Sequence, residues 1–202
     1  RLETEQIIEI VRDIVDLNDN YTFLDIGTGS GAIIITLKKK LISNGHLSFY
    51  GSDISSKAIK VAKINNQKHL CHTNNKINFY TGHLIHSKLI TILTRRTQNQ
   101  KLIIIANLPY LSKTESTISS IAKKYEPHPA LFAKNNGLDL YQKLFKQIKR
   151  YKISFYAIII EIDAENAHKF LQICNQYFPK SKISLIKDIN NRNRFITITT
   201  SK

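Results

Sequence analysis

The hydrophobic positions along the chain switch between two periodicities. Residues 3–17 place Ile7, Ile8, Val11 and Val15 at helical spacing, which predicts a helix with one buried face. Continuous apolar runs then predict buried strands at residues 22–26, 46–54, 76–82, 101–107 and 155–162. The stretches between these runs predict helices at residues 30–41, 55–70, 85–96, 114–124, 137–151 and 163–177. In the helix over 55–70, we expect Ala58, Ile59, Val61 and Ala62 to face inward.

Strands that alternate with helices are typical of a parallel sheet covered by helices on both faces. The last two apolar runs, residues 182–188 and 194–200, have only the short segment Ile189–Asn193 between them. They therefore predict a hairpin, which adds one antiparallel strand to the sheet. The fold class is α/β, with a seven-stranded, mostly parallel sheet in a single domain.

The composition says more about the partners and the cellular compartment of the protein than about its reaction. The net charge of +15 favours anionic partners such as nucleic acid or ribosomes, although a Lys-, Asn- and Ile-rich genome explains it equally well. No apolar run approaches the roughly 20 residues that span a bilayer, so we expect no membrane association. Two distant cysteines favour a reducing cytoplasm. The cluster His69, Cys71 and His72 matches no zinc spacing, so no metal is predicted.

A glycine-rich turn follows the first predicted strand and opens the next helix. Gly27, Gly29 and Gly31 allow a tight turn and let a ligand approach the main chain, whose amides face it at the helix start. Asp53 ends the second strand, where an acid can hold both hydroxyls of a ribose. The spacing formally fits a dinucleotide. Asp25 repels a pyrophosphate but suits the ammonium of S-adenosylmethionine, so the turn favours the latter cofactor.

The fourth strand ends on the sequence Asn107-Leu108-Pro109-Tyr110. Its carboxyl end is expected beside that of the first strand, so this corner stands over the reactive methyl group of the cofactor. A conjugated amino group is a poor nucleophile that gains from acceptors for both N–H bonds. The Asn107 side-chain carbonyl and the Leu108 backbone carbonyl supply such acceptors, Pro109 stiffens the loop and Tyr110 covers a flat group.

These motifs carry a resemblance. The string Asp-Ile-Gly-Thr-Gly-Ser-Gly resembles the first motif of class I methyltransferases, whose fold is Rossmann-like, and Asn-Leu-Pro-Tyr resembles their Asn-Pro-Pro-Tyr motif for planar amino groups. Further matches are to the HemK/PrmC family of release factor glutamine methyltransferases. They lie in the opening residues 1–5 and at Glu126, Pro127, Ala130, Leu131, Gly137, Leu138, Tyr141, Asp188, Arg192 and Arg194. The resemblance therefore covers almost the whole chain.

The resemblance implies methyl transfer from S-adenosylmethionine to the glutamine amide in the Gly-Gly-Gln loop of peptide chain release factors. It implies that the cofactor is bound by Asp25, Gly27, Thr28, Gly29, Ser30, Gly31, Asp53, His83, Leu84 and Asn107. The glutamine amide is held by Asn107, Leu108, Pro109 and Tyr110. The family carries a small helical domain before the catalytic one, so this chain, which lacks an initiator Met, is expected to be the catalytic domain of a longer protein. We expect a monomer.

Several departures keep two alternatives open. Leu108 replaces a proline of the motif and is also typical of ribosomal RNA adenine dimethylases, so adenine methylation of RNA or DNA is the first alternative. His83 stands where the family has an acid that accepts from the adenine amino group, and Asp163 and Asn166 replace an expected Gly and Gln. The second alternative is a catalytically weak binding module on the ribosome.

Overall fold

The computed structural model describes residues 2–41, 45–70, 77–96, 99–108 and 138–200. A seven-stranded sheet runs through its centre in the order β3-β2-β1-β4-β5-β7-β6. The strands are β1 Tyr21–Ile26, β2 Leu47–Asp53, β3 Asn78–Thr81, β4 Lys101–Ala106, β5 Ala157–Glu161, β6 Lys182–Lys187 and β7 Asn193–Thr199. The helices are α1 Leu2–Ile14, α2 Ala32–Lys40, α3 Ser56–Leu70, α4 Ser87–Arg96, α7 Leu138–Arg150 and α8 Ala167–Tyr177, with a 3₁₀ turn η2 at Ala164–Asn166.

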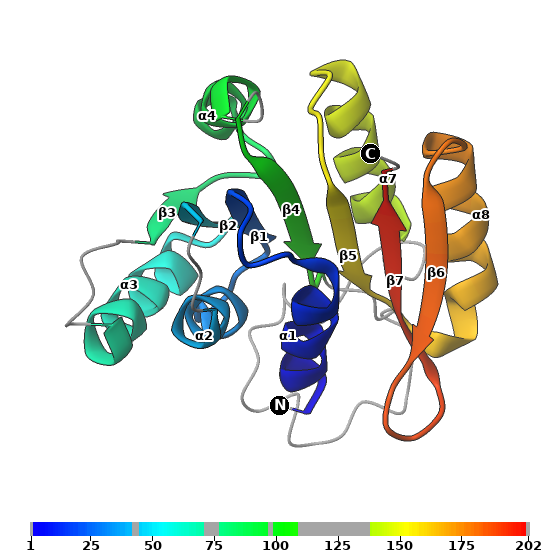
Figure 1. The fold of residues 1–202 in the computed structure, drawn as a ribbon, viewed down its shortest axis with the longest axis horizontal. Coiled ribbons are helices and arrows are strands. Elements are labelled where there is room, and N and C mark those ends of the chain that lie inside the picture. The colour runs from blue at the N-terminus through cyan, green and yellow to red at the C-terminus, as the bar shows by residue number, and fades with distance from the viewer. Residues whose placement is uncertain (1, 42–44, 71–76, 97–98, 109–137, 201–202) are drawn as a thin grey trace.

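The direction of the strands agrees with the sequence pattern. Strands β1 to β5 pair in parallel, and β7 is antiparallel to both β5 and β6. In Figure 1 the arrowheads of β4 and β5 therefore point to one edge of the sheet, while that of β7 points to the other. The predicted seven-stranded, mostly parallel sheet with one antiparallel strand is confirmed.

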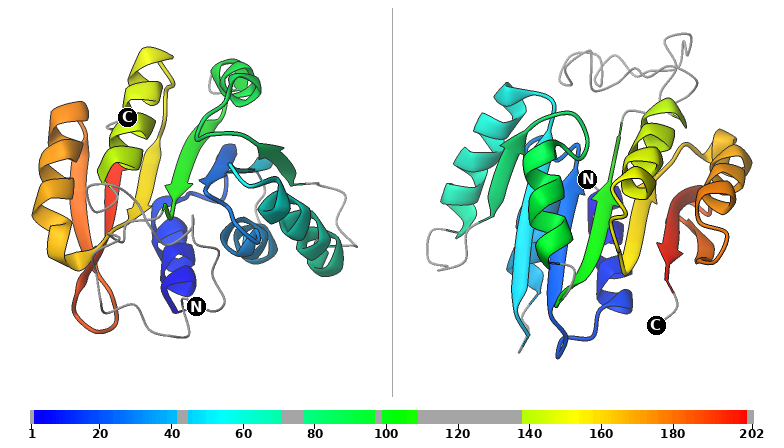
Figure 2. Two further views of the ribbon diagram at one scale, coloured as in Figure 1. Left: turned by 180° about the vertical axis from the view of Figure 1, so that it is seen from behind. Right: turned by 90° about the horizontal axis from the view of Figure 1, so that it is seen from above.

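Two apolar layers sandwich the sheet (Figure 2). Side chains of α1, α2 and α3 pack on one face against Phe23, Phe49 and Ile103, and those of α4, α7 and α8 pack on the other against Leu24 and Ile104. Strand β4 lies between β1 and β5 and is buried on both faces, which explains its continuous apolar run. The helices packed on both faces thus fix the position of the carboxyl end of β4.

One expectation about α3 is wrong. Val61 was predicted to face inward, but 46% of it is exposed, whereas Ala62 on the same helix is fully buried. The reason is close helix packing, because a Cβ added to Gly31 would lie 3.2 Å from the Ala62 Cβ. Only a small side chain fits at that contact, and Val61 lies about 100° further round the helix. The helix predicted over 114–124 lies outside the described residues.

Candidate functional site

The glycine turn and the carboxyl ends of four strands lie together at one end of the sheet, which we call the site edge. Strands β1 and β4 are in register from Tyr21 with Lys101 to Ile26 with Ala106, so the turn after β1 and the corner after β4 begin side by side. A Cβ added to Gly27 would lie 2.9 Å from Leu108 Cδ2 and 3.4 Å from the Asn107 backbone oxygen. The fold therefore brings together the two motifs that the sequence singled out.

All three glycines of the turn have left-handed backbone conformations. Their φ angles are 74° at Gly27, 53° at Gly29 and 80° at Gly31. A side chain at Gly27 would collide with Leu108, whereas a Cβ at Gly29 would meet nothing within 4 Å. The main chain at Gly29 thus faces open space, as close approach by a ligand requires.

Asp53 ties the end of β2 to this turn. Its Oδ2 accepts a hydrogen bond of 2.9 Å from the Gly29 amide, and its Oδ1 accepts one of 2.8 Å from the Ser55 amide. The carboxylate is only partly buried and keeps further lone pairs for a ligand. That Asp53 holds the two hydroxyls of a ribose stays a prediction.

Asp25 lies beneath the turn and not on its open side. The residue has no exposed surface, and its Oδ2 accepts a hydrogen bond of 2.6 Å from the Thr28 hydroxyl. Its other oxygen has no hydrogen-bond partner among the described residues. Burial is the main cause that raises the pKa of Asp25 to about 7; the Thr28 hydrogen bond opposes this rise, and the charge of nearby Asp53 adds to it. Asp25 thus holds the turn through Thr28, and direct contact with a cofactor ammonium stays a prediction.

The loop after β3 is held against the end of β2. Its Gly82 amide donates to the Asp53 backbone oxygen at 2.9 Å, and its Leu84 carbonyl accepts from the Ser52 hydroxyl at 2.8 Å. Leu84 is buried and has a φ of 52°, a conformation that leucine rarely adopts. His83 is exposed. Ser30 is also exposed, and its carbonyl accepts from Asn65 at 2.9 Å. No described contact of His83 indicates a role, so its role and that of Ser30 in binding stay predictions.

The corner at Asn107 is held by side chains from three other elements. Asn107 Nδ2 donates a hydrogen bond of 2.6 Å to Glu161 Oε2 at the end of β5. Glu161 is 3% exposed, and its Oε1 lies 3.4 Å from Arg194 Nη2 on β7. The Leu108 amide donates to the Tyr141 hydroxyl of α7 at 3.1 Å. Pro109 and Tyr110, predicted to stiffen and cover the corner, lie outside the described residues, as does 126–137.

Sequence reasoning found Asn107 but missed the side chain that binds it. Glu161 is an acid at the end of the apolar strand Ala-Ile-Ile-Ile-Glu, and that position was the available signal. Tyr141 and Arg194 entered only through a family resemblance. The Tyr141 hydroxyl contacts the Ala106 and Glu161 backbone oxygens at 3.1 and 2.7 Å, so it joins the ends of β4 and β5.

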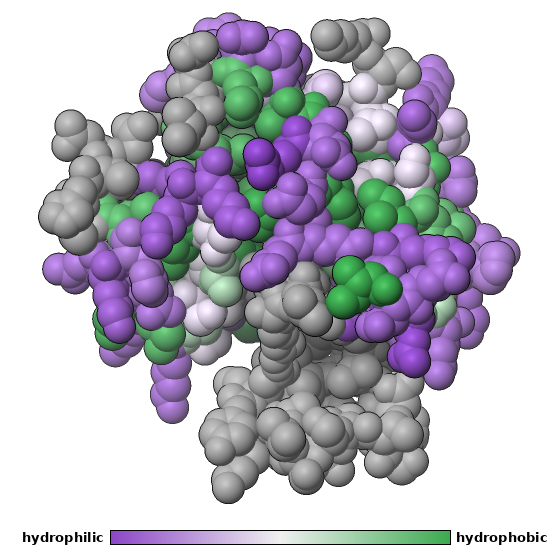
Figure 3. Space-filling model, turned by 60° about the horizontal axis from the view of Figure 1, so that its bottom comes forward, coloured by the Kyte–Doolittle hydropathy of each residue, from purple (hydrophilic) through white to green (hydrophobic). Residues whose placement is uncertain are grey.

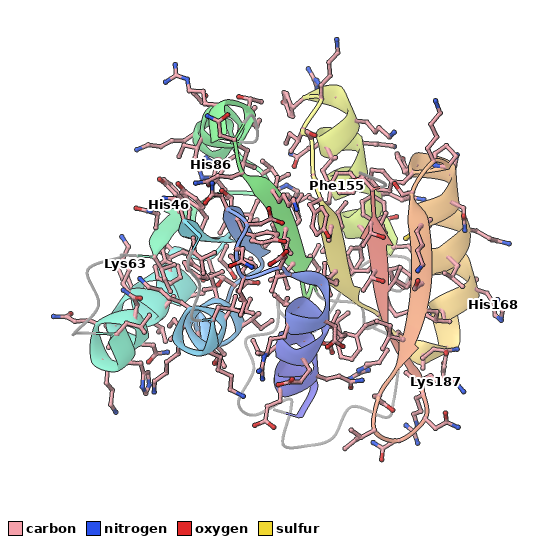
Figure 4. All side chains as sticks on the ribbon, in the orientation of Figure 1. His46, Lys63, His86, Phe155, His168 and Lys187 are labelled. Atoms are coloured by element: carbon pink, nitrogen blue, oxygen red, sulfur yellow. The ribbon has the colours of Figure 1, made fainter. Side chains whose placement is uncertain are left out.

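The described residues on the face that carries this end of the sheet are mostly polar. In Figure 3 hydrophilic residues cross it in a band that is broken by smaller hydrophobic areas. A hollow of about 600 Å³ lies elsewhere, between the end of α7, Phe155 and Phe178. Figure 4 shows Phe155 and Lys187 toward opposite ends of the sheet, and Lys187 ends β6, which points in the same direction as β1 to β5. The hollow is thus at the far edge and takes no part in the site.

Comparison with known proteins shows the family of the chain. A methyltransferase domain family matches residues 17–199. The chain belongs to this methyltransferase family. It is 35% identical over 199 residues to a release factor glutamine methyltransferase of Dictyoglomus turgidum, and 31% identical over 198 residues to that of Staphylococcus aureus. Each alignment covers 98% of this chain and 66% of the relative, so the chain spans just under two thirds of their length. The recognised family is confirmed.

Solved structures agree on the fold. Magnesium protoporphyrin IX methyltransferase from Synechocystis PCC 6803, solved with bound SAM, has a TM-score of 0.60 and 14% identity, covering 98% of this chain and 78% of that one. The match confirms the class I methyltransferase fold. Among the described residues no helix has the length and hydrophobicity to cross a membrane, and no group of His, Cys, Asp and Glu is arranged to hold a metal ion.

Proposed function

We propose that this chain transfers a methyl group from S-adenosyl-L-methionine to the side-chain amide nitrogen of the glutamine in the Gly-Gly-Gln motif of peptide chain release factors. The observation that carries the proposal is Asn107. It stands at the end of β4 against the glycine turn, and its NH2 group is bonded to Glu161. Its side-chain oxygen has no hydrogen-bond partner among the described residues, so it is available to an N–H donor. The names of the relatives support glutamine as that donor.

The residues of the glycine turn fit the cofactor. Gly29 offers open main chain, Asp53 offers carboxylate oxygens for the ribose, and Asp25 stabilises the turn from beneath. When bound there, S-adenosylmethionine would supply an electrophilic methyl group on a sulfonium. Its leaving group would be a neutral thioether, and the methylated amide nitrogen would lose its proton to water. The chain contributes position and charge placement, since Asn107 and the Leu108 carbonyl orient the amide and no covalent intermediate with the protein is needed.

The decisive experiment offers the full-length protein two acceptors with labelled cofactor. Release factor and deproteinised ribosomal RNA are incubated separately, and the label on each is counted. We expect label on the glutamine of the release factor and none on RNA. Label on RNA alone would instead establish the adenine methyltransferase that Leu108 and the net charge of +15 favour. Label on neither acceptor would favour a binding module.

The remaining parts of the proposal concern the setting. Release factors are the partner, the protein acts as a monomer in the cytoplasm, and residues 1–202 form its catalytic domain. Size-exclusion chromatography of the full-length protein with and without a release factor tests the monomer and the partner together. A 1:1 complex is expected.

A further inference from the structure

The contact between Asn107 and Glu161 joins the ends of two neighbouring strands. Strands β4 and β5 are parallel and in register from Ile103 with Ala157 to Ala106 with Ile160, so the next residues on each strand stand side by side. The Asn107 Nδ2 to Glu161 Oε2 distance of 2.6 Å is short for a nitrogen donor. Hydrogen bonds with a charged partner are shorter than neutral ones and about twice as strong.

The chemistry of the partner decides which way the Asn107 amide points. An amide offers a donor at one end and an acceptor at the other, and an ionised carboxylate only accepts. The Arg194 guanidinium, 3.4 Å from Glu161 Oε1, favours the ionised carboxylate. The NH2 of Asn107 must then face Glu161, and the carbonyl oxygen must face away from it.

Glu161 itself is fixed from two sides. Its side chain is held by Arg194, and its backbone oxygen contacts the Tyr141 hydroxyl at 2.7 Å. The backbone of the next residue, Ile162, donates to the Arg194 carbonyl at 2.9 Å, which keeps β5 and β7 together at this point. With 3% of Glu161 exposed, water does not compete for the carboxylate.

We propose that Glu161 is a positioning residue, which sets the Asn107 amide so that its oxygen, and not its NH2, faces the nitrogen that receives the methyl group. Arg194 holds Glu161 in the orientation that this requires. If the Asn107 amide were reversed, its NH2 group would face the N–H group of the substrate. The nitrogen that receives the methyl group would then lose its hydrogen bond, and two donors would repel each other. The proposal rests on the proposed function for the identity of the acceptor, but the orientation of Asn107 is a property of the free protein.

Glu161→Gln replaces a carboxylate, which only accepts hydrogen bonds, by an amide of nearly the same shape that can also donate. The oxygen of the introduced amide is expected to face Arg194, so that its NH2 faces Asn107 and turns the Asn107 amide round. We expect kcat for release factor methylation to fall about 100-fold, the usual effect of losing one preorganised hydrogen-bond partner of the reacting group. The Kd of the cofactor should change little. A kcat within threefold of the wild type would overturn the proposal.

The reciprocal exchange tests the same bond from the other side. Asn107→Asp places two carboxylates together and is expected to be nearly inactive. The double variant Asn107→Asp/Glu161→Gln restores one donor and one acceptor, and one oxygen of the introduced carboxylate stays free to accept from the substrate. We expect it to regain at least tenfold in kcat over the weaker single variant. A double variant no better than that single variant would contradict the proposal.

A matched control and a substrate-free measurement separate this proposal from the proposed function. Glu165→Gln changes an exposed glutamate on the neighbouring turn η2 and should leave kcat unchanged. The side-chain NH2 resonances of Asn107 in a ¹⁵N correlation spectrum, assigned by their loss in Asn107→Asp, should shift in Glu161→Gln and not in Glu165→Gln. If the wild type methylates no release factor but these resonances shift, the proposed function fails and the positioning role stands. Unshifted resonances overturn the positioning role.

Discussion

The two halves of the site edge are built in different ways. The half that we assign to the cofactor, from the turn after β1 to Asp53, is made mainly of backbone, with three glycines at positive φ and two amides hydrogen-bonded to a single carboxylate. The half that we assign to the methyl acceptor is made of Asn107, just after β4, and of side chains from α7, β5 and β7. Backbone shape depends on a few adjacent residues, whereas the side-chain network depends on the strand order. The two halves should therefore fail in different ways when they are mutated.

The largest effect is expected in the acceptor half. Asn107→Ala removes the oxygen that we assign to the substrate amide and leaves Glu161 without its 2.6 Å donor. Turnover should fall by about 10³, while cofactor binding falls much less, because only the reacting group loses its partner. Single-turnover methylation and calorimetric cofactor titration of the same preparation measure both. Full activity in this variant would remove Asn107 from the site.

A smaller effect, on stability and cofactor binding together, is expected in the cofactor half. Gly27→Ala places a methyl group 2.9 Å from Leu108 Cδ2 on a backbone with a φ of 74°. The strained φ and the overlap together should cost about 3 kcal/mol in the free energy of unfolding. Gly29→Ala is the control, because its Cβ meets nothing within 4 Å and only the φ strain of about 1 kcal/mol remains.

The Gly29→Ala variant also tests where the cofactor binds. Its Cβ occupies the open space that we assign to the cofactor, so affinity should fall even though the fold is nearly intact. Urea unfolding gives the stability of both variants, and cofactor titration gives the affinity. If Gly29→Ala bound the cofactor as tightly as the wild type, the ligand would not approach the main chain there.

The join between the halves is tested at Tyr141. Tyr141→Phe removes the hydroxyl that contacts the Ala106 and Glu161 carbonyls and the Leu108 amide. Buried groups left without a partner cost about 1–3 kcal/mol, so stability should fall by about 2 kcal/mol. Activity should fall with cofactor affinity unchanged, since only the acceptor half is loosened. A loss of cofactor affinity equal to the loss of activity would show that the two halves are not separable.

The smallest effect is expected from Asp25, as a change in how steeply the free energy of unfolding depends on pH. Because its pKa is raised from an ordinary value of 3.8 to about 7 by folding, the folded protein binds more protons than the unfolded chain between these two values. This contribution to stability is fully present below the lower value and is lost as the pH rises through the higher one, at about 1 kcal/mol per pH unit. Asp25→Asn should remove that slope from the stability measured by urea unfolding between about pH 5 and 7. An unchanged slope would mean that Asp25 is already ionised at the acidic end of that range.

The elements of the fold followed from the pattern of hydrophobic positions. The Ile-rich run of β4 is buried on both faces, and the glycine turn, Asp53 and Asn107 were found because each closes a strand. Val61 shows the limit within a helix, because a helical pattern does not tell which apolar position meets the close contact between α2 and α3. Glu161 shows the limit for the site, since its partner Asn107 lies 54 residues earlier in the chain.

The sequence by itself determined the local backbone: where strands end, where glycine permits a positive φ, and which polar residues stand at those ends. Only the tertiary structure decided which of those ends meet. It placed β5 between β4 and β7, so that Glu161 contacts both Asn107 and Arg194. The physical reason is that φ and ψ respond to neighbouring residues, whereas the direction of a side-chain amide is set by the partner that the sheet brings beside it.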